Sequence, residues 1–205
     1  MTETVWAVRH GQRQDTVDPD WELTADRVHD PGLTELGRWQ AWRCGRYFAD
    51  RGITFDAIYC SPFLRAVQTT AEICGEIGGE ACLEPGLGEH RNNEWFDSEP
   101  ETLSQHTLAD YFDPIRNDHD AFIIPEFPEA HHEAEQRAGV AARDAAAAHD
   151  ERVLLVGHGL TIGGVVRGLV GSTEGVHAPL CGITRMDRAG EEWDLTFSGH
   201  VDHLE

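Results

Sequence analysis

Two short apolar segments, far apart in the chain, end in closely similar sequences. Residues 5–11 read Val-Trp-Ala-Val-Arg-His-Gly, and residues 153–159 read Val-Leu-Leu-Val-Gly-His-Gly. Apolar runs of this length that contain β-branched residues indicate buried strands. Ligands bind in the loops at the carboxyl ends of parallel strands. We therefore expect His10 and His158 to meet in one pocket.

Strand-like and helix-like segments alternate through the rest of the sequence. We expect Thr34 to cap one helix and Pro62 to stand in the first turn of another. Strands are predicted at 4–9, 56–60, 152–156, 183–187 and 193–197, and helices at about 34–50, 63–77, 129–149 and 161–170. This alternation predicts an α/β fold, a three-layer sandwich with a mainly parallel sheet and helices on both faces.

Residues 84–128 differ in kind from the rest of the chain. They hold five of the nine prolines, many acidic residues and little periodicity. We expect them to form an irregular insertion over the C-terminal edge of the sheet. A chain of 205 residues can bury a substantial core. We therefore expect a single domain over 1–205 that includes the insertion.

The charge balance is strongly one-sided. The chain has 37 acidic residues against 16 basic ones, all of them Arg, and its formal net charge is −21. Such a surface repels phosphate backbones, which argues against nucleic acid as a partner. It also repels itself in the folded state, and salt screens that repulsion.

The acidity and the absence of Lys suggest a halophilic source, with a merely acidic mesophilic protein as the alternative. We expect the unfolding midpoint to rise between low and molar potassium chloride, because screening relieves repulsion among carboxylates. Thermal denaturation at the two salt concentrations measures this. A midpoint that stays level would overturn the halophilic hypothesis.

Composition also indicates the cellular compartment in which the protein works. No stretch of eighteen apolar residues is present, so no membrane span is predicted. The first four residues lack the basic flank and apolar region of a secretory signal. The five cysteines contain no C-x-x-C pair and are expected to be reduced thiols in a cytoplasmic protein.

Arginines and glycines gather around the two strand-end histidines. Guanidinium groups pair bidentately with phosphate oxygens, and glycine N–H groups can approach an oxyanion closely. A neutral imidazole among such ligands is a plausible nucleophile, which points to phosphoryl transfer through a phosphohistidine. No metal ion is needed, because the arginines stabilise the charge. The arginines are Arg9, Arg13 and Arg65, and the glycines are Gly11 and Gly159.

Four ordered motifs resemble the histidine phosphatase superfamily, the phosphoglycerate mutase-like group. They are Arg-His-Gly at 9–11, Leu-Thr-x-x-Gly-x-x-Gln-Ala at 33–41, Ser-Pro-x-x-Arg-Ala-x-Gln-Thr-x-Ala at 61–71 and Gly-His-Gly at 157–159. The segment 199–204 also looks like the family's tail. A lone Arg-His-Gly would be weak evidence, but four motifs in family order are specific. The resemblance implies a phosphoglycerate mutase-like fold and an enzyme without a cofactor.

The resemblance also implies roles for the matching residues. His10 would be the nucleophile that becomes phosphorylated. Arg9 and Arg65 would bind the phosphoryl oxygens, and His158 would donate to the same oxygens. Ser61 lacks the G-x-S-x-G context of a nucleophile and is expected to cap the following helix.

The acid–base carboxylate of the family follows a short strand in the middle of the chain. Here Glu89 fits, and Glu94 is the competing candidate. Nearby guanidinium groups should lower the pKa of Glu89, whereas desolvation by the insertion should raise it. A bound phosphate dianion offsets the guanidinium charge. We therefore expect a protonated Glu89 more in the Michaelis complex than in the free enzyme, with an acidic or near-neutral optimum.

The sequence departs from the phosphoglycerate mutases after the first motif. Mutases continue with Glu-Ser and then an Asn, whereas residues 9–15 here read Arg-His-Gly-Gln-Arg-Gln-Asp. This pattern resembles the subgroup that contains the ubiquitin-associated and SH3-domain phosphatases and the ecdysteroid-phosphate phosphatases. In that subgroup the second arginine also binds phosphate, which implies this role for Arg13.

We therefore expect a cofactor-independent phosphomonoester phosphatase acting on a small molecule. The alternatives are a mutase-type phosphotransferase and a non-catalytic phosphate-binding protein on the same fold. The acidity of 84–128 disfavours polyanionic substrates, and Trp95 and Phe96 could flank an apolar leaving group. Weak homodimers are common among such folds, and the sequence leaves the oligomeric state undecided.

Overall fold

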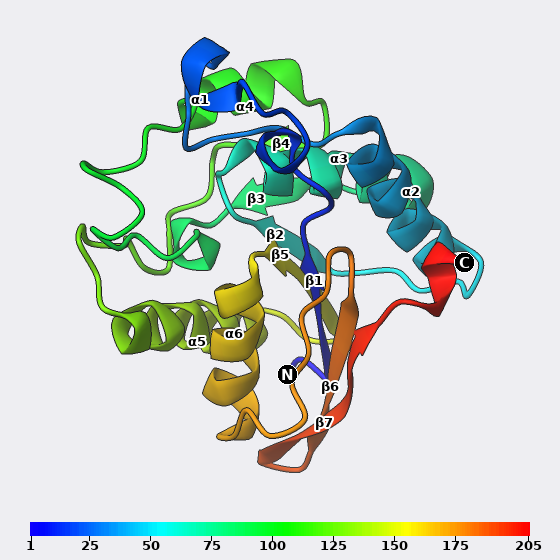
Figure 1. Cartoon of the computed structure of the whole chain (residues 1–205). Coiled ribbons are helices and arrows are strands. Elements are labelled where there is room, and N and C mark those ends of the chain that lie inside the picture. The colour runs from blue at the N-terminus through cyan, green and yellow to red at the C-terminus, as the bar shows by residue number, and fades with distance from the viewer.

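One seven-stranded sheet forms the centre of the molecule (Figure 1). The computed structural model describes all 205 residues and orders the strands β4-β3-β2-β5-β1-β6-β7. Strands β1 to β5 run parallel, and β6 pairs antiparallel with both β1 and β7. The predicted α/β fold with a mainly parallel sheet is confirmed. The strands are β1 (Thr4–Arg9), β2 (Ala57–Cys60), β3 (Ala81–Leu83), β4 (Ile115–Arg116), β5 (Arg152–Gly157), β6 (Ile183–Ala189) and β7 (Glu192–His200).

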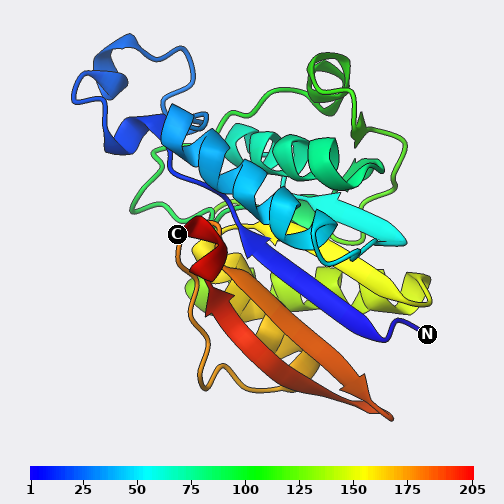
Figure 2. The same cartoon turned by 90° about the vertical axis from the view of Figure 1, so that its right-hand side faces the viewer.

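Helices cover both faces of the sheet (Figure 2). Successive strand side chains point to opposite faces. Trp6 and Val8 of β1 accordingly join one buried apolar cluster, and Val5 and Ala7 join another. The first cluster contains buried residues of α2 and α3, and the second those of α5 and α6. These helices are α2 (Glu35–Ala49), α3 (Leu64–Ile77), α5 (His131–Ala148) and α6 (Gly159–Val170).

The helix starts agree with the sequence only in part. Thr34 caps α2, since its hydroxyl accepts a hydrogen bond from the Gly37 N–H at 2.9 Å. Helix α3 begins at Leu64, so the expectation that Pro62 stands in its first turn is wrong. The Leu64 N–H instead donates to the buried carboxylate of Asp30 at 2.7 Å. A carboxylate from a distant loop therefore supplies the cap.

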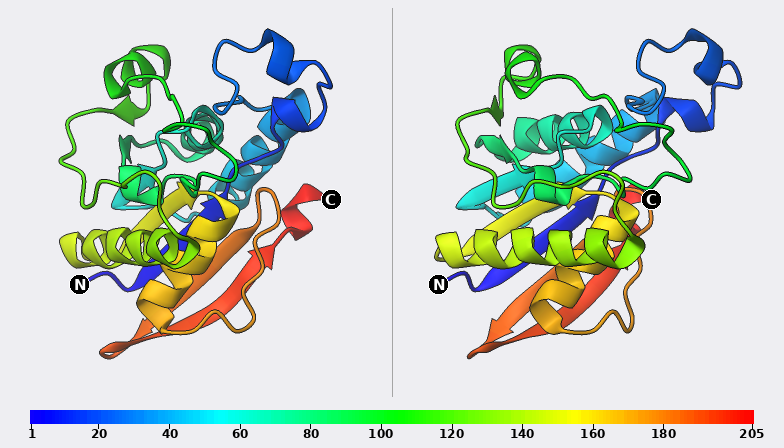
Figure 3. Two further views of the ribbon diagram at one scale, coloured as in Figure 1. Left: turned by 60° about the vertical axis from the view of Figure 1, so that its left-hand side comes forward. Right: turned by 90° about the vertical axis from the view of Figure 1, so that its left-hand side faces the viewer.

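Residues 84–128 carry more regular structure than the sequence predicts. They contain a 3₁₀ turn η2 (Pro85–Leu87), a helix α4 (Gln105–Tyr111) and the edge strand β4. The rest is irregular and reaches the end of the sheet toward which β1 points (Figure 3). The buried Glu84 anchors it, because its carboxylate accepts hydrogen bonds from the N–H groups of Gly86 and Phe122 at 2.7 and 2.8 Å.

The remaining elements are short and lie outside the sheet. They are η1 (Gln14–Thr16), α1 (Trp21–Thr24) and η3 (Asp202–Leu204). All five cysteines are free thiols. No helix combines the length and apolar character that crossing a membrane requires.

Candidate active site

The two strand-end histidines lie in one buried site. His10 follows β1 and His158 follows β5, and these strands are parallel neighbours whose last paired residues are Arg9 and Gly157. The two imidazole rings lie 5.2 Å apart between centroids, and both are buried. The geometry thus brings together the pair on which the sequence argument depends.

The His10 ring is oriented by its own backbone neighbour. Its Nδ1 lies 2.8 Å from the carbonyl oxygen of Gly11. A carbonyl oxygen only accepts hydrogen bonds, so Nδ1 carries the proton and Nε2 keeps a free lone pair. Burial lowers the pKa of His10 well below its ordinary value, and the charges of Arg65 and His158 lower it further. The ring is therefore neutral and suited to nucleophilic attack through Nε2.

This electrostatic setting gives a testable pH dependence. Because the pKa of His10 is depressed, the ring should stay neutral as the pH falls through the ordinary histidine pKa of about 6.5. The ring NMR signals that vanish in His10→Ala should therefore not titrate in that range. Titration of the His10 signals near the ordinary histidine pKa would contradict the assignment.

Ser61 orients the second histidine. Its Oγ accepts a hydrogen bond from the Phe63 N–H at 3.3 Å and lies 2.8 Å from Nε2 of His158. A carboxylate only accepts hydrogen bonds, so the nearby Glu89 favours the tautomer with the proton on Nδ1, and Nε2 then accepts from the Ser61 hydroxyl. That Nδ1 lies 3.2 Å from Oε2 of Glu89. Burial lowers the pKa of His158 to about 4, although Glu89 opposes this shift. Ser61 thus orients a neutral donor, and its only link to the helix start is the Phe63 N–H just before α3.

Arg65 and Glu89 form the opposite wall. The Arg65 guanidinium is buried, and its Nη2 donates to Oε2 of Glu89 at 3.1 Å. Its Nε and Nη1 have no hydrogen-bond partner in the protein. Buried polar groups are normally hydrogen-bonded, so two unpaired guanidinium donors indicate a place for an oxyanion.

The free protein favours an ionised Glu89. Burial acts to raise the pKa of this carboxyl, but the hydrogen bond with His158 and the charge of Arg65 outweigh burial and hold it well below its usual range. The lowered pKa agrees with the effect on Glu89 that is expected of nearby guanidinium groups. A proton on Glu89 therefore requires something that offsets the nearby positive charge.

The other predicted phosphate ligands fall into two groups. Arg9, Arg13 and Gly159 line the same cleft as His10. Gly159 is the first residue of α6, and helix N-termini favour anions. Gly11 differs from the prediction, because its N–H donates to the Thr69 hydroxyl at 3.2 Å. A Cβ on Gly11 would lie 2.5 Å from the carbonyl oxygen of Gly37, so close packing against α2 explains this glycine.

The cleft has a volume of about 550 Å³, and some of its lining residues were not foreseen. Trp95, Leu160 and Leu180 give it an apolar side, and Thr16 adds a hydroxyl. Phe96 and His29 line an adjoining hollow. No periodic sequence pattern marks these residues, because separate segments contribute them: Thr16 ends η1, His29 precedes α2, Leu160 lies in the first turn of α6 and Leu180 precedes β6.

Of the two candidate carboxylates, only Glu89 reaches this site. It lines the cleft and contacts both Arg65 and His158. Glu94 is exposed, and its N–H donates to the side chain of Asn92.

The site is poorly suited to a cation. His10, Glu89 and His158 each offer one ligand atom, and these atoms lie within 4.8 Å of one another. The guanidinium groups of Arg9, Arg13 and Arg65 surround the same space and repel a metal ion. An anion fits this charge distribution better.

Comparison with known proteins gives a match to one family over most of the chain. A family model described as the histidine phosphatase superfamily (branch 1) matches residues 5–199. The 2,3-bisphosphoglycerate-dependent phosphoglycerate mutase of Rhizobium meliloti is 40% identical over 86 residues, 41% of this chain and 37% of that protein. The same enzyme of Brucella ovis is 37% identical over 89 residues, 42% of this chain and 38% of that protein. The matches thus span less than two fifths of these relatives.

Solved structures share the whole fold. The ecdysone phosphate phosphatase from Bombix mori, in complex with tungstate, superposes with a TM-score of 0.80 at 21% identity, covering 95% of this chain and 92% of that chain. The phosphoserine phosphatase from Entamoeba histolytica, in complex with 3-phosphoglyceric acid, gives a TM-score of 0.68 at 21% identity, with 100% of both chains covered. At these identities the likeness establishes the fold.

Proposed function

Because the chain belongs to branch 1 of the histidine phosphatase superfamily, we propose that it hydrolyses phosphomonoesters through a phosphohistidine at His10, without a cofactor. One observation carries this proposal. The free lone pair of a neutral His10 shares a buried site with Arg65, two of whose guanidinium donors have no partner in the protein. A nucleophile and an unsatisfied anion site in one place are what phosphoryl transfer requires.

The first half-reaction transfers the phosphoryl group to the protein. Nε2 of His10 attacks phosphorus, the bond from phosphorus to the ester oxygen breaks, and the alcohol leaves with a proton from Glu89. The guanidinium groups of Arg9, Arg13 and Arg65 hold the phosphoryl oxygens. His158 donates to the same oxygens through Nδ1–H. In this way charge that develops in the transition state meets preorganised donors.

The second half-reaction releases inorganic phosphate. Glu89, now ionised, takes a proton from water as its oxygen attacks phosphorus. The bond between phosphorus and Nε2 breaks, and the nitrogen recovers its lone pair. Glu89 ends protonated and ready for the next substrate. A bound phosphate dianion offsets the guanidinium charge, which favours this protonated form in the complex.

A phosphatase is favoured over a mutase. The polar loop after His10 carries Arg13 at the cleft, and mutases have Glu-Ser at the start of that loop. The apolar side of the cleft, formed by Trp95, Leu160 and Leu180, suits an apolar alcohol or phenol as the leaving group. A non-catalytic binding role is disfavoured because the nucleophile, the donor, the carboxylate and the arginines all meet in one site.

The direct test is phosphate release from p-nitrophenyl phosphate in buffer that contains a metal chelator. We expect turnover under these conditions, because guanidinium groups supply the charge that a metal ion would supply elsewhere. Interconversion of 2- and 3-phosphoglycerate, assayed in parallel, should be absent or far slower. Rapid interconversion would support the mutase alternative, and the absence of both activities would support the binding protein.

A further inference from the structure

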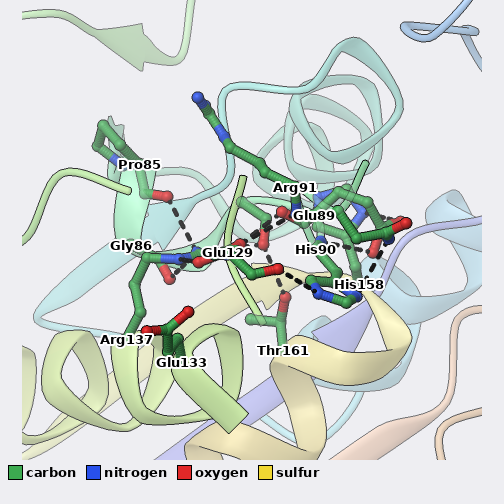
Figure 4. A network of polar contacts seen from close by, with 12 residues as sticks. Pro85, Gly86, Glu89, His90, Arg91, Glu129, Glu133, Arg137, His158 and Thr161 are labelled. Carbon is green, nitrogen blue, oxygen red and sulfur yellow. Dashed lines mark hydrogen bonds and ion pairs between the residues drawn. The ribbon is translucent and has the colours of Figure 1, made fainter. Parts of the chain in front are cut away.

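A single buried guanidinium holds the backbone turn that precedes Glu89. Arg137 of α5 donates from Nη1 to the carbonyl oxygens of Pro85, Gly86 and Gly88 at 3.4, 2.7 and 3.3 Å. Its Nη2 donates to the carbonyl oxygen of Glu89 itself at 3.2 Å (Figure 4). Four carbonyls of one short segment thus converge on one side chain.

An acidic partner completes the contact on the other side of Glu89. Glu129 accepts from Nε and Nη2 of Arg137 at 2.9 and 2.5 Å, and both side chains are buried. The same carboxylate accepts from the Arg91 N–H at 3.0 Å. The carbonyl oxygen of Glu129 lies 3.0 Å from Nε2 of His90. The Arg137–Glu129 pair therefore grips the chain before and after Glu89.

The turn packs directly on the helix that bears Arg137. A Cβ added to Gly86 would lie 2.8 Å from the Cβ of Ala141 of α5. Thr161 of α6 lies 3.2 and 3.3 Å from the carbonyl oxygens of Leu87 and Gly88 and donates its hydroxyl to this pair. Arg137 is the hydrogen-bond donor to the carbonyls of Gly86 and Glu89. Without it these buried carbonyls would lose that donor, and each unpaired group would favour rearrangement of the turn.

Fold stability alone does not account for such a pair. Burying an ion pair costs about as much desolvation energy as its attraction returns, and apolar replacements are often equally stable. What apolar side chains cannot do is hold four backbone carbonyls in one direction. At the end of this segment, Oε2 of Glu89 lies 3.1 Å from Nη2 of Arg65 and 3.2 Å from Nδ1 of His158.

We propose that Arg137, itself held by Glu129, is a positioning residue that sets the Glu89 carboxylate for proton transfer to and from the reacting oxygens. This inference rests on the proposed function and deepens it. Arg137 is not among the residues that line the cleft. It acts through the backbone of residues 85–89.

The choice of leaving group distinguishes a role of Arg137 in positioning Glu89 from a role in fold stability alone. An alkyl phosphate needs a proton on its departing oxygen, whereas p-nitrophenolate leaves without one. kcat/KM reports the step in which the alcohol departs. A misplacement of the acid by about 1 Å can reduce a rate by about a hundredfold. Loss of correct positioning should therefore affect kcat/KM for alkyl phosphates selectively.

The experiment compares Arg137→Lys and Glu129→Gln with wild type on β-glycerophosphate and p-nitrophenyl phosphate. Arg143→Lys is the matched control, since Arg143 lies on the same helix, is exposed and donates to Gly168. In both test variants we expect kcat/KM to fall about tenfold to a hundredfold on the alkyl phosphate. On p-nitrophenyl phosphate it should change by less than about threefold, and the control should match wild type.

The outcomes decide the proposal. Equal losses on both substrates, together with a lowered unfolding midpoint, would show a merely structural role and overturn it, and so would unchanged kinetics. Glu129→Gln alters the Arg137–Glu129 ion pair and leaves the Arg137 side chain unchanged. This variant therefore provides the test if Arg137→Lys fails to fold. If wild type hydrolyses neither substrate, the proposed function fails. That result differs from one in which wild type is active and the positioning role of Arg137 is refuted.

Discussion

Replacing His10 with Ala should abolish phosphomonoester hydrolysis, with a fall in kcat of about 10⁴-fold or more. The buried, neutral imidazole lines the cleft and keeps the lone pair of Nε2 free for attack. Steady-state release of p-nitrophenol measures the loss. Fold integrity is checked by circular dichroism, since removing a buried imidazole also leaves a small cavity.

Covalent labelling makes the prediction specific. Wild type mixed with ³²P-labelled substrate and quenched in alkali should retain label in an acid-labile, alkali-stable bond, as a phosphohistidine does. His10→Ala should retain none. His158→Ala is the matched control, because it removes a donor and leaves the nucleophile in place, so it should turn over slowly and still become labelled. Label that survives in His10→Ala would refute the assignment.

The fold was predictable where the sequence is locally periodic. The strands at β1 and β5, the Thr34 cap and the helix at 131–148 were all predicted at or near their observed bounds. Local composition specifies these elements, because strand alternation and helix capping act over a few residues. The sharing of one pocket by His10 and His158 follows from the same logic, since both follow adjacent parallel strands.

Contacts between distant segments were not predictable from the sequence. Asp30 caps a helix that begins 34 residues later, and Arg137 contacts a turn about 50 residues earlier. The Ser61–His158 contact joins two strand ends 97 residues apart. No residue-type pattern encodes such pairings, because they arise only when the sheet order places the loops together. The same reason explains why Pro62 was assigned the wrong local role and why the contact of the Gly11 N–H with Thr69 was not expected.

The overall charge and the local charge have opposite signs, and this contrast bears on substrate size. The chain carries a net charge of −21, yet three arginines line one cleft and its adjoining hollow. Arg13 pairs with a half-buried carboxylate, Asp15, at 3.0 Å. An anion therefore meets net repulsion from the chain as a whole and attraction from the arginines at the cleft. This arrangement favours esters with a single phosphate over polyanionic substrates.

Glu89→Gln should separate the two half-reactions. Gln cannot donate a carboxyl proton, so kcat/KM for alkyl phosphates should fall by about 10²–10⁴-fold, the usual contribution of a general acid. On p-nitrophenyl phosphate the first step needs no acid, whereas the second still needs a base. Stopped-flow measurement should therefore show a burst of p-nitrophenolate equal to the enzyme concentration, followed by slow turnover. Glu94→Gln, which alters an exposed carboxylate outside the cleft, is the control.

The pH profile gives the same assignment independently. In wild type, kcat/KM for an alkyl phosphate should fall as pH rises, because the pKa of Glu89 in the free enzyme is already low and the acid form becomes scarcer. In Glu89→Gln this limb should disappear, leaving only the ionisation of the substrate. An optimum well above pH 9, a profile unchanged by Glu89→Gln, or a loss confined to Glu94→Gln would exclude Glu89 as the acid. The Glu89 carboxylate lies between Arg65 and His158, and its protonation depends on bound phosphate. Only the loss of this carboxylate should therefore remove the falling limb from the pH dependence of kcat/KM for an alkyl phosphate.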